Sequence, residues 1–428
     1  MRPWFREGAV ANAPTGVMRT PNLRHRGLND MLLSQAVAMA SAVLVTFVTA
    51  HFLGPSGRGQ VAFVTATGNL LGAAAFMSIH VGVTHAHKAG DTTALPRGLR
   101  VSMVSAVGVL LLTSAVAGVM FALHQPLAPQ LALAAVGSSL VCFNLGVLRT
   151  RQGLGDARVF RNAWIIQALI YVSLATAAAV LAHSPHIVIY AWYVGMIIST
   201  AYALRGYPRD HLASLTARQR YSTRSIITTS LSAHVGFTGI QALYRADVVI
   251  LGFIVSARDL GIYSIAAPIA ELTWGFSEAL SLVAFSQVRA LQTPGERQMD
   301  RRKLIYINMV AGAIGAVLIL VTAFVVLPRI LPDYREATPL ICILLPGVLV
   351  QGSSRIAFSA LVATGVRRPA IIVGVVSAIL ALLYIPFALM WGITGAAIAS
   401  TVIYFLQAGV VFRIVSRSET HLGRRVHP

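Results

Sequence analysis

Two charged residues, Arg245 and Asp247, stand inside the apolar run ALYRADVVILGF at residues 242–253. A guanidinium presents a fork of N–H donors that suits phosphate oxygens, whereas a carboxylate can take a proton or bind a cation. Charged groups are costly in an apolar environment. Their presence here predicts either a structural ion pair or a site for a charged ligand.

Further polar residues recur at helical spacing in neighbouring apolar stretches. In a predicted helix over 226–255, intervals of four, three and four residues place a polar stripe on one face: His234, Thr238, Gln241 and Arg245. Glu271 and Glu278 lie seven residues apart in the next predicted helix, 261–287, and therefore also share a face.

These patterns give two groups of candidate site residues. The predicted substrate-binding residues are Arg245, Arg355, Gln241, Gln351 and Asn69. The predicted coupling or cavity-lining residues are Asp247, Glu271, Glu278 and His234. No catalytic residue, metal ligand set or cofactor site is predicted, and the absence of a P-loop signature agrees with a chain that is not an enzyme.

Two simpler interpretations of the charges remain open. An ionised side chain that faces lipid at mid-membrane costs about 2.5–3.5 kcal/mol, so these residues should face the protein interior. Arg245 could pair with Glu271 or Glu278 only to hold helices together. Arg245 and Asp247 could also extend to the membrane surface, because both lie in the outer half of their predicted helix.

The composition places the chain in a lipid bilayer. Of its 428 residues, 56% are hydrophobic and only 11% are charged, with a mean hydropathy of +0.72. A soluble domain usually has about 25% charged residues. About 20 apolar residues cross a bilayer, and such stretches lie at 31–53, 60–86, 101–123, 129–148, 162–182, 186–204, 226–255, 261–287, 304–327, 337–361, 370–390 and 393–412.

The basic residues predict the orientation of these crossings. With the N-terminus in the cytoplasm, 28 of the 34 Lys and Arg residues fall in inner segments and four in outer loops. Cytoplasmic loops retain Lys and Arg during insertion, so both termini are expected to be cytoplasmic. This distribution accounts for the net charge of +20 without a nucleic-acid partner.

The expected fold is an all-α integral membrane protein with about 12 transmembrane helices in two six-helix bundles around a central cleft. The expected parts are a cytoplasmic tail (1–30), an N-terminal lobe (31–208), a cytoplasmic linker (209–224), a C-terminal lobe (225–415) and a second tail (416–428). A weak internal repeat aligns Gly59 with Gly261, which also places Leu70 on Leu272. Such repeats commonly enclose a substrate site at their interface.

Three segments resemble a known family: YRADVVILGFIVSARDLGIYSIAAPIAEL (244–272), YREATPLICILLPGVLVQGSSRIAFSALVATG (334–365) and GITGAAIASTVIYF (392–405). They are similar to polysaccharide biosynthesis membrane proteins, the O-antigen and exopolysaccharide flippases of the multidrug/oligosaccharidyl-lipid/polysaccharide exporter superfamily. The resemblance covers about residues 28–415. Because an Arg and an Asp occur at the YRAD position in that family, the resemblance singles out Arg245 and Asp247.

The resemblance implies an alternating-access flippase in the bacterial inner membrane. It would move a polyprenyl-pyrophosphate-linked oligosaccharide from the cytoplasmic to the outer leaflet, beside membrane lipids. Expected partners are a polysaccharide polymerase and glycosyltransferases, and H⁺ or Na⁺ is a candidate coupling ion. The alternative is a cation-coupled multidrug or small-molecule antiporter of the same superfamily.

Overall fold

The computed structural model describes residues 21–205, 207, 221–288, 294–363 and 367–426. Every secondary-structure element in these ranges is helical, as the composition predicts. The predicted tail at 1–30 and the predicted linker at 209–224 lie largely outside the described residues.

The first half of the described chain forms six α-helices, the fifth of which continues as the π-helix η1 (Ala178–Ala182). α1 covers the predicted stretch 31–53 and part of 60–86, whereas each of α3 to α6 corresponds to one predicted stretch. The six helices are α1 (Pro21–Ala75), α2 (Ile79–Lys88), α3 (Ala94–Ala122), α4 (Ala128–Gly153), α5 (Ala157–Ala177) and α6 (Pro185–Arg205).

The second half contains α8 (Thr223–Ile254), α9 (Ala257–Glu271), α10 (Trp274–Val288), α11 (Pro294–Val321), α12 (Leu327–Ile330), α13 (Ala337–Ala363), α14 (Arg367–Ala381) and α15 (Tyr384–Val426). Short π and 3₁₀ turns, η2 (Thr322–Val326) and η3 (Pro332–Tyr334), flank α12. Three predicted helices are broken: 60–86 between α1 and α2, 261–287 between α9 and α10, and 370–390 between α14 and α15.

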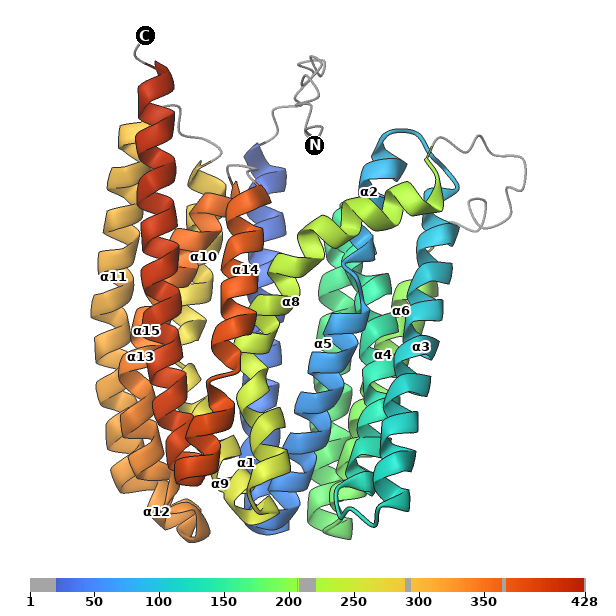
Figure 1. The fold of residues 1–428 in the computed structure, drawn as a ribbon, viewed down its shortest axis with the longest axis vertical. Helices are drawn as coiled ribbons and strands as arrows, with labels where there is room; N and C mark the ends of the chain where they lie inside the picture. Colours follow the sequence, from blue (N-terminus) through green and yellow to red (C-terminus); the bar gives the residue numbers. More distant parts are fainter. Residues whose placement is uncertain (1–20, 206, 208–220, 289–293, 364–366, 427–428) are drawn as a thin grey trace.

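Two of the long helices reverse direction within their bounds. In α1 the backbone leaves the helical region at Gly54, whose φ of 65° favours glycine, and Pro55 starts the returning half. In α15 the same happens at Trp391 and Gly392, where the φ of the glycine is 56°. Figure 1 shows α1 descending and then returning toward α2.

Nine of the helices in the described ranges are long and apolar enough to cross a membrane. The broken helices α9, α10 and α14 are shorter, so the count of twelve crossings stays a prediction. Large apolar side chains on α3 and α11 point outward, including Leu112 and Phe121 at 68% and 72% exposure and Leu318 at 63%. In a bilayer these faces contact lipid rather than water.

The helices form two groups that lie side by side, α3 to α6 in one and α9 to α15 in the other, with α1 and α8 between them (Figure 1). The start of α1 and the end of α15 lie at the same end of the molecule, at the top of Figure 1. We call this the inner end, following the orientation predicted from charge, and the opposite end the outer end.

Backbone packing closes the groups against each other at the outer end. A Cβ atom on Gly59 would lie 1.9 Å from the carbonyl oxygen of Ala257, and one on Gly261 would lie 1.9 Å from that of Pro55. The returning half of α1 and the first turns of α9 therefore touch through glycines at both positions, because no larger residue fits. These are the two glycines that the internal repeat aligns.

A buried carboxylate ties the loop before α3 to Tyr221, two residues before α8. Asp91 accepts hydrogen bonds from the backbone N–H of Tyr221 (3.0 Å) and from Thr93, and it pairs with the Arg97 guanidinium at 2.6 Å. Burial alone would raise the pKa of Asp91, but the bonds from Thr93, Tyr221 and Arg97 together hold it below its usual value.

Replacing Asp91 with asparagine is expected to lower the thermal unfolding midpoint of the purified protein, because it leaves Arg97 without its counter-ion at a cost of about 3 kcal/mol. A depressed pKa stabilises the fold above the unfolded-state pKa of about 3.9. The difference between wild type and variant should therefore be complete near neutral pH and vanish as the pH falls through the folded-state pKa. Thermal scans at several pH values measure it.

The matched control for this prediction is Glu336→Gln. Glu336 also pairs with an arginine, Arg258 at 2.9 Å, but both side chains are exposed, at 56% and 50%. Exposed pairs contribute little to stability, so this change should be nearly silent. Equal effects of the two changes at all pH values would contradict the role given to Asp91.

Candidate functional site

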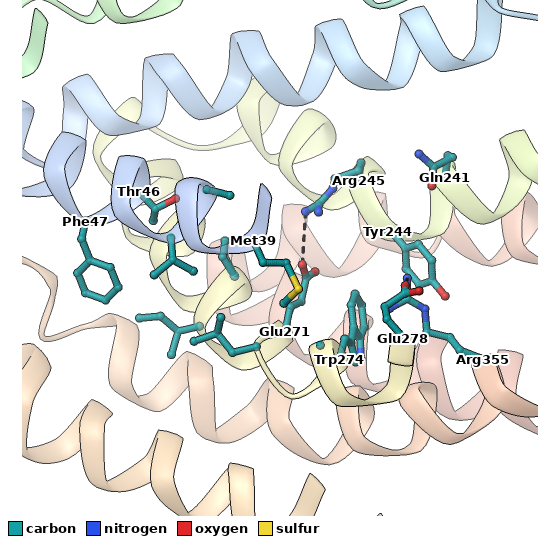
Figure 2. A pocket seen from close by; sticks show the side chains of 16 residues that line it. Met39, Thr46, Phe47, Gln241, Tyr244, Arg245, Glu271, Trp274, Glu278 and Arg355 are labelled. Carbon is teal, nitrogen blue, oxygen red and sulfur yellow. Dashed lines mark hydrogen bonds and ion pairs between the residues drawn. The ribbon is translucent and has the colours of Figure 1, made fainter. Parts of the chain in front are cut away.

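A partly open cavity of about 340 Å³ lies between α1 and the second half of the chain. Figure 2 shows its walls, which come from the descending half of α1 and from α8, α9, α10 and α13. The side of α1 is mostly apolar and includes Met39 and Phe47, whereas the opposite wall carries the charges. The charged and amide side chains that line it are Gln241, Arg245, Glu271, Glu278 and Arg355.

Arg245 is the most accessible charge in this wall. Its Nη1 lies 3.5 Å from Oε2 of Glu271, and 46% of the Arg245 side chain is exposed (Figure 2). A long, exposed pair of this kind contributes only about 0–1 kcal/mol. The guanidinium therefore keeps most of its five donors for another anion.

Arg355 is held more firmly. Its Nη2 lies 2.8 Å from Oε1 of Glu278, and the guanidinium carbon sits 4.6 Å from the ring centre of Trp274 and 4.8 Å from that of Tyr244. Both rings are within the range of cation–π attraction. The two aromatic rings and the carboxylate fix the orientation of Arg355, and its side chain remains 22% exposed.

The charges are arranged along the helix axes from the outer to the inner end. Arg245 lies nine residues before the outer end of α8, or about 14 Å at 1.5 Å per residue. Arg355 lies eighteen residues after the outer start of α13, or about 27 Å. An anionic group moving through the cavity would meet these two guanidiniums in succession.

Four of the predicted site residues lie outside the lining of the cavity. Gln351 is fully buried behind the wall, where its Nε2 donates to the Tyr244 hydroxyl at 2.9 Å. It therefore positions an aromatic ring that covers Arg355. Asn69 lies on an exposed face of α1 and bonds to the Thr65 carbonyl of its own helix.

Asp247 is buried within the second group of helices. Its Oδ2 accepts from the Tyr263 hydroxyl and its Oδ1 from the Val248 backbone N–H, both at 2.8 Å. Ser400 continues this chain of hydroxyls at 3.1 Å from Tyr263. Two residues along the helix from Arg245, the carboxylate points away from the cavity, as helical geometry requires.

His234 joins α8 to the break between α1 and α2. Its Nε2 donates to the Ala74 carbonyl at 2.8 Å, which leaves Nδ1 to accept from the Ser78 hydroxyl at 3.2 Å. Both ring nitrogens are thus used between helices, and His234 lies away from the cavity. The polar stripe read along α8 therefore contributes Gln241 and Arg245 to the cavity and His234 to packing.

Tyr244 and Trp274 are site residues that the polar pattern did not reveal. The two rings lie 5.1 Å apart and form the aromatic part of the wall around Arg355. Tyr and Trp both count as hydrophobic in the composition, so a pattern of polar residues does not include them. The position of Tyr244 next to Arg245 was the available signal. Adjacent residues on a helix differ in direction by about 100°, so both can border the same cavity when that cavity is wide.

No family model and no curated protein matches the chain. Solved structures match it: an inward-facing multidrug resistance MATE family transporter of the MOP superfamily has a TM-score of 0.72 at 14% identity, over 92% of this chain and 99% of that chain. The chain shares the fold of this transporter.

A second neighbour is the lipid II flippase MurJ in an inward closed conformation, with a TM-score of 0.67 at 12% identity, over 92% of this chain and 87% of that chain. An outward-facing MATE family transporter scores lower, at 0.60 with 14% identity, over 95% of this chain and 99% of that chain. At these identities the likeness concerns the fold. We call α1 to α6 the first bundle and α8 to α15 the second bundle.

Proposed function

We propose that this protein is an alternating-access flippase that moves a polyprenyl-pyrophosphate-linked oligosaccharide from the cytoplasmic to the outer leaflet. The observation that carries the proposal is the pair of accessible guanidiniums, Arg245 and Arg355, set in succession along a cavity between the bundles. An anionic headgroup and a polar glycan cannot cross hydrocarbon unaided. The lipid tail can stay in the bilayer beside the protein, so the cavity shelters only the head.

The acidic partners give the cavity a way to release its cargo. Glu271 and Glu278 hold the two arginines when no substrate is present, at 3.5 and 2.8 Å. A pyrophosphate that displaces a carboxylate exchanges one charge-assisted interaction for another, so binding is selective for anions without becoming too tight to reverse. An inside-negative potential would assist the outward movement of negative charge by about 2.3 kcal/mol per charge per 100 mV.

The experiment that tests the function is deletion of the gene in the source organism. Polyprenyl-pyrophosphate-linked glycan is expected to accumulate on the cytoplasmic leaflet and to return to normal when the full chain is supplied. Extraction of lipid-linked glycans and mass spectrometry identify the sugar. Unchanged glycan lipids, together with new sensitivity to small cationic drugs, would instead support an antiporter.

The buried carboxylate of Asp247 is the observation that favours the antiporter as a second candidate. Within the described part of the chain, no Lys or Arg nitrogen lies within ion-pair distance of it, and its contacts are hydroxyl and backbone donors. Such a group can take a proton or a small cation and couple it to a conformational change. In a flippase the same site would supply H⁺ or Na⁺ coupling.

A further inference from the structure

Arg58 is a buried cation for which the ion pairs and polar stripes above give no role. In the sequence Arg58 counts among the outer-loop charges. In the structure the residue is only 8% exposed, and its side chain points into the protein from the first turn of the returning half of α1. Nη1 and Nη2 reach the hydroxyls of Thr49 and Thr46 at 3.4 and 3.3 Å. Both distances are long for hydrogen bonds.

The surroundings of Arg58 leave its charge uncompensated. No carboxylate within the described ranges lies within ion-pair distance, and Nε is buried without a hydrogen-bond partner. The ionisable groups that influence it are two neutral phenols, Tyr171 of α5 and Tyr334 of η3. A buried guanidinium with vacant donors and no counter-ion is costly, and an anion would relieve that cost.

Arg58 lies behind the cavity wall and extends the series of cations toward the outer end. Thr46, which accepts from its Nη2, lines the outer part of the cavity on α1 (Figure 2). Arg58 lies four residues from the outer turn at Gly54, or about 6 Å, compared with about 14 Å for Arg245 and about 27 Å for Arg355. The three guanidiniums thus stand at successive depths, with Arg58 nearest the outer end.

The packing of the bundles explains why Arg58 is covered. It is adjacent to Gly59, whose contact with Ala257 closes the outer end. Tyr334 of the second bundle is near enough to influence the Arg58 charge, and its hydroxyl donates to the Ala50 carbonyl of α1 at 3.3 Å. Separation of α1 from both α9 and η3 would uncover Arg58. The group would then face the outer side of the membrane.

We propose that Arg58 is an anion-binding residue at the outer end of the pathway, which takes the phosphate group of the substrate from Arg245 when the outer end opens. This inference rests on the proposed function and adds a release-side site to it. While the outer end is closed, the guanidinium makes only its two long contacts with Thr46 and Thr49. The substrate class it fits is a phosphate or pyrophosphate ester.

The test separates binding from export with the full-length chain. Binding of a sugar-free polyprenyl pyrophosphate is measured in lipid nanodiscs, and export is measured in the deletion strain as the loss of accumulated lipid-linked glycan. Arg58→Gln should bind the probe within about twofold of wild type but export at least about tenfold more slowly, the usual effect of one lost charge-assisted hydrogen bond. Arg58→Lys keeps the positive charge but lacks the forked donors of a guanidinium, so its export rate should lie between those of wild type and Arg58→Gln.

Thr49→Val is the control for a purely structural role. It removes one hydroxyl partner of Arg58 and leaves the cation in place. Near-normal export by Thr49→Val beside slow export by Arg58→Gln supports the anion site, whereas equal losses of export and of thermal stability in both variants overturn it. Normal export by Arg58→Gln also overturns it. Should Arg58→Gln fail to fold, Arg58→Lys decides: export at least about threefold slower supports the site, and wild-type export overturns it.

The two proposals fail in different ways. Failure of wild type to bind the probe, together with normal export by Arg245→Gln, would overturn the flippase function and the outer site with it. Loss of binding in Arg245→Gln together with normal export by Arg58→Gln would overturn the outer site alone.

Discussion

Arg245→Gln is expected to reduce export of the lipid-linked glycan by about 100-fold and to weaken binding of polyprenyl pyrophosphate to a similar extent. Two charge-assisted hydrogen bonds from one guanidinium to a phosphate contribute about 3 kcal/mol, which corresponds to this factor. The fold should be retained, because the pair with Glu271 is long and the Arg245 side chain is 46% exposed. Export in the deletion strain and nanodisc binding measure the two effects.

Arg329→Gln is the matched control for Arg245→Gln. Arg329 is an exposed residue of α12, at the outer end of the molecule. Among the described contacts it donates a hydrogen bond only to the Val325 carbonyl. Its replacement should leave export unchanged. Normal export and binding by Arg245→Gln would remove the phosphate role and leave Arg245 as a structural partner of Glu271.

Gly261→Val should abolish export and hold the outer end open. The new Cβ would lie 1.9 Å from the Pro55 carbonyl oxygen, a backbone atom that no side-chain rotation can move away. Overpacking in a tight contact costs about 1–3 kcal/mol or more, and here the whole cost falls on the conformation in which α1 and α9 touch. The equilibrium therefore shifts toward conformations in which they separate.

A cysteine at position 49 reports this shift. Thr49 is fully buried, so in a background without Cys142 and Cys342 the change Thr49→Cys should react poorly with a membrane-impermeant thiol reagent added outside. In the Gly261→Val background labelling should rise at least about tenfold, as expected for a population shift of about 1.4 kcal/mol. Gly118→Val is the control, because a Cβ at Gly118 of α3 meets nothing within 4 Å. Unchanged labelling with normal export would show that this contact is not a gate.

Gly59 and Gly261 pack against backbone carbonyls and close the outer end. Opening there would expose Arg58, so the gate and the proposed outer anion site form one device.

The amino-acid sequence by itself determined the class of fold and the bounds of most helices. Apolar stretches at 129–148, 186–204 and 337–361 lie within α4, α6 and α13. These features are local, because about 20 apolar residues need a bilayer and satisfy their own backbone hydrogen bonds as a helix. The sequence also indicated Gln241, Arg245, Glu271, Glu278 and Arg355, which line the cavity, since a charge in an apolar helix must face the protein interior.

Only the tertiary structure decided which of these charges meet. Arg58 reads as a loop charge because it follows Gly54 and Pro55, yet helix packing buries it beside Thr46. Asp247 and Gln351 belong to polar stretches like those of Arg245 and Arg355, yet they face the interior of a bundle. Pairing depends on the rotation of each helix and on contacts between different helices, such as that of Arg245 with Glu271, 26 positions apart, and that of Gln351 with Tyr244, 107 positions apart. Local hydropathy and residue spacing contain no information about helix rotation or about contacts between helices. The cavity wall, the glycine contact at the outer end and the burial of Arg58 therefore follow only from the packing of the bundles.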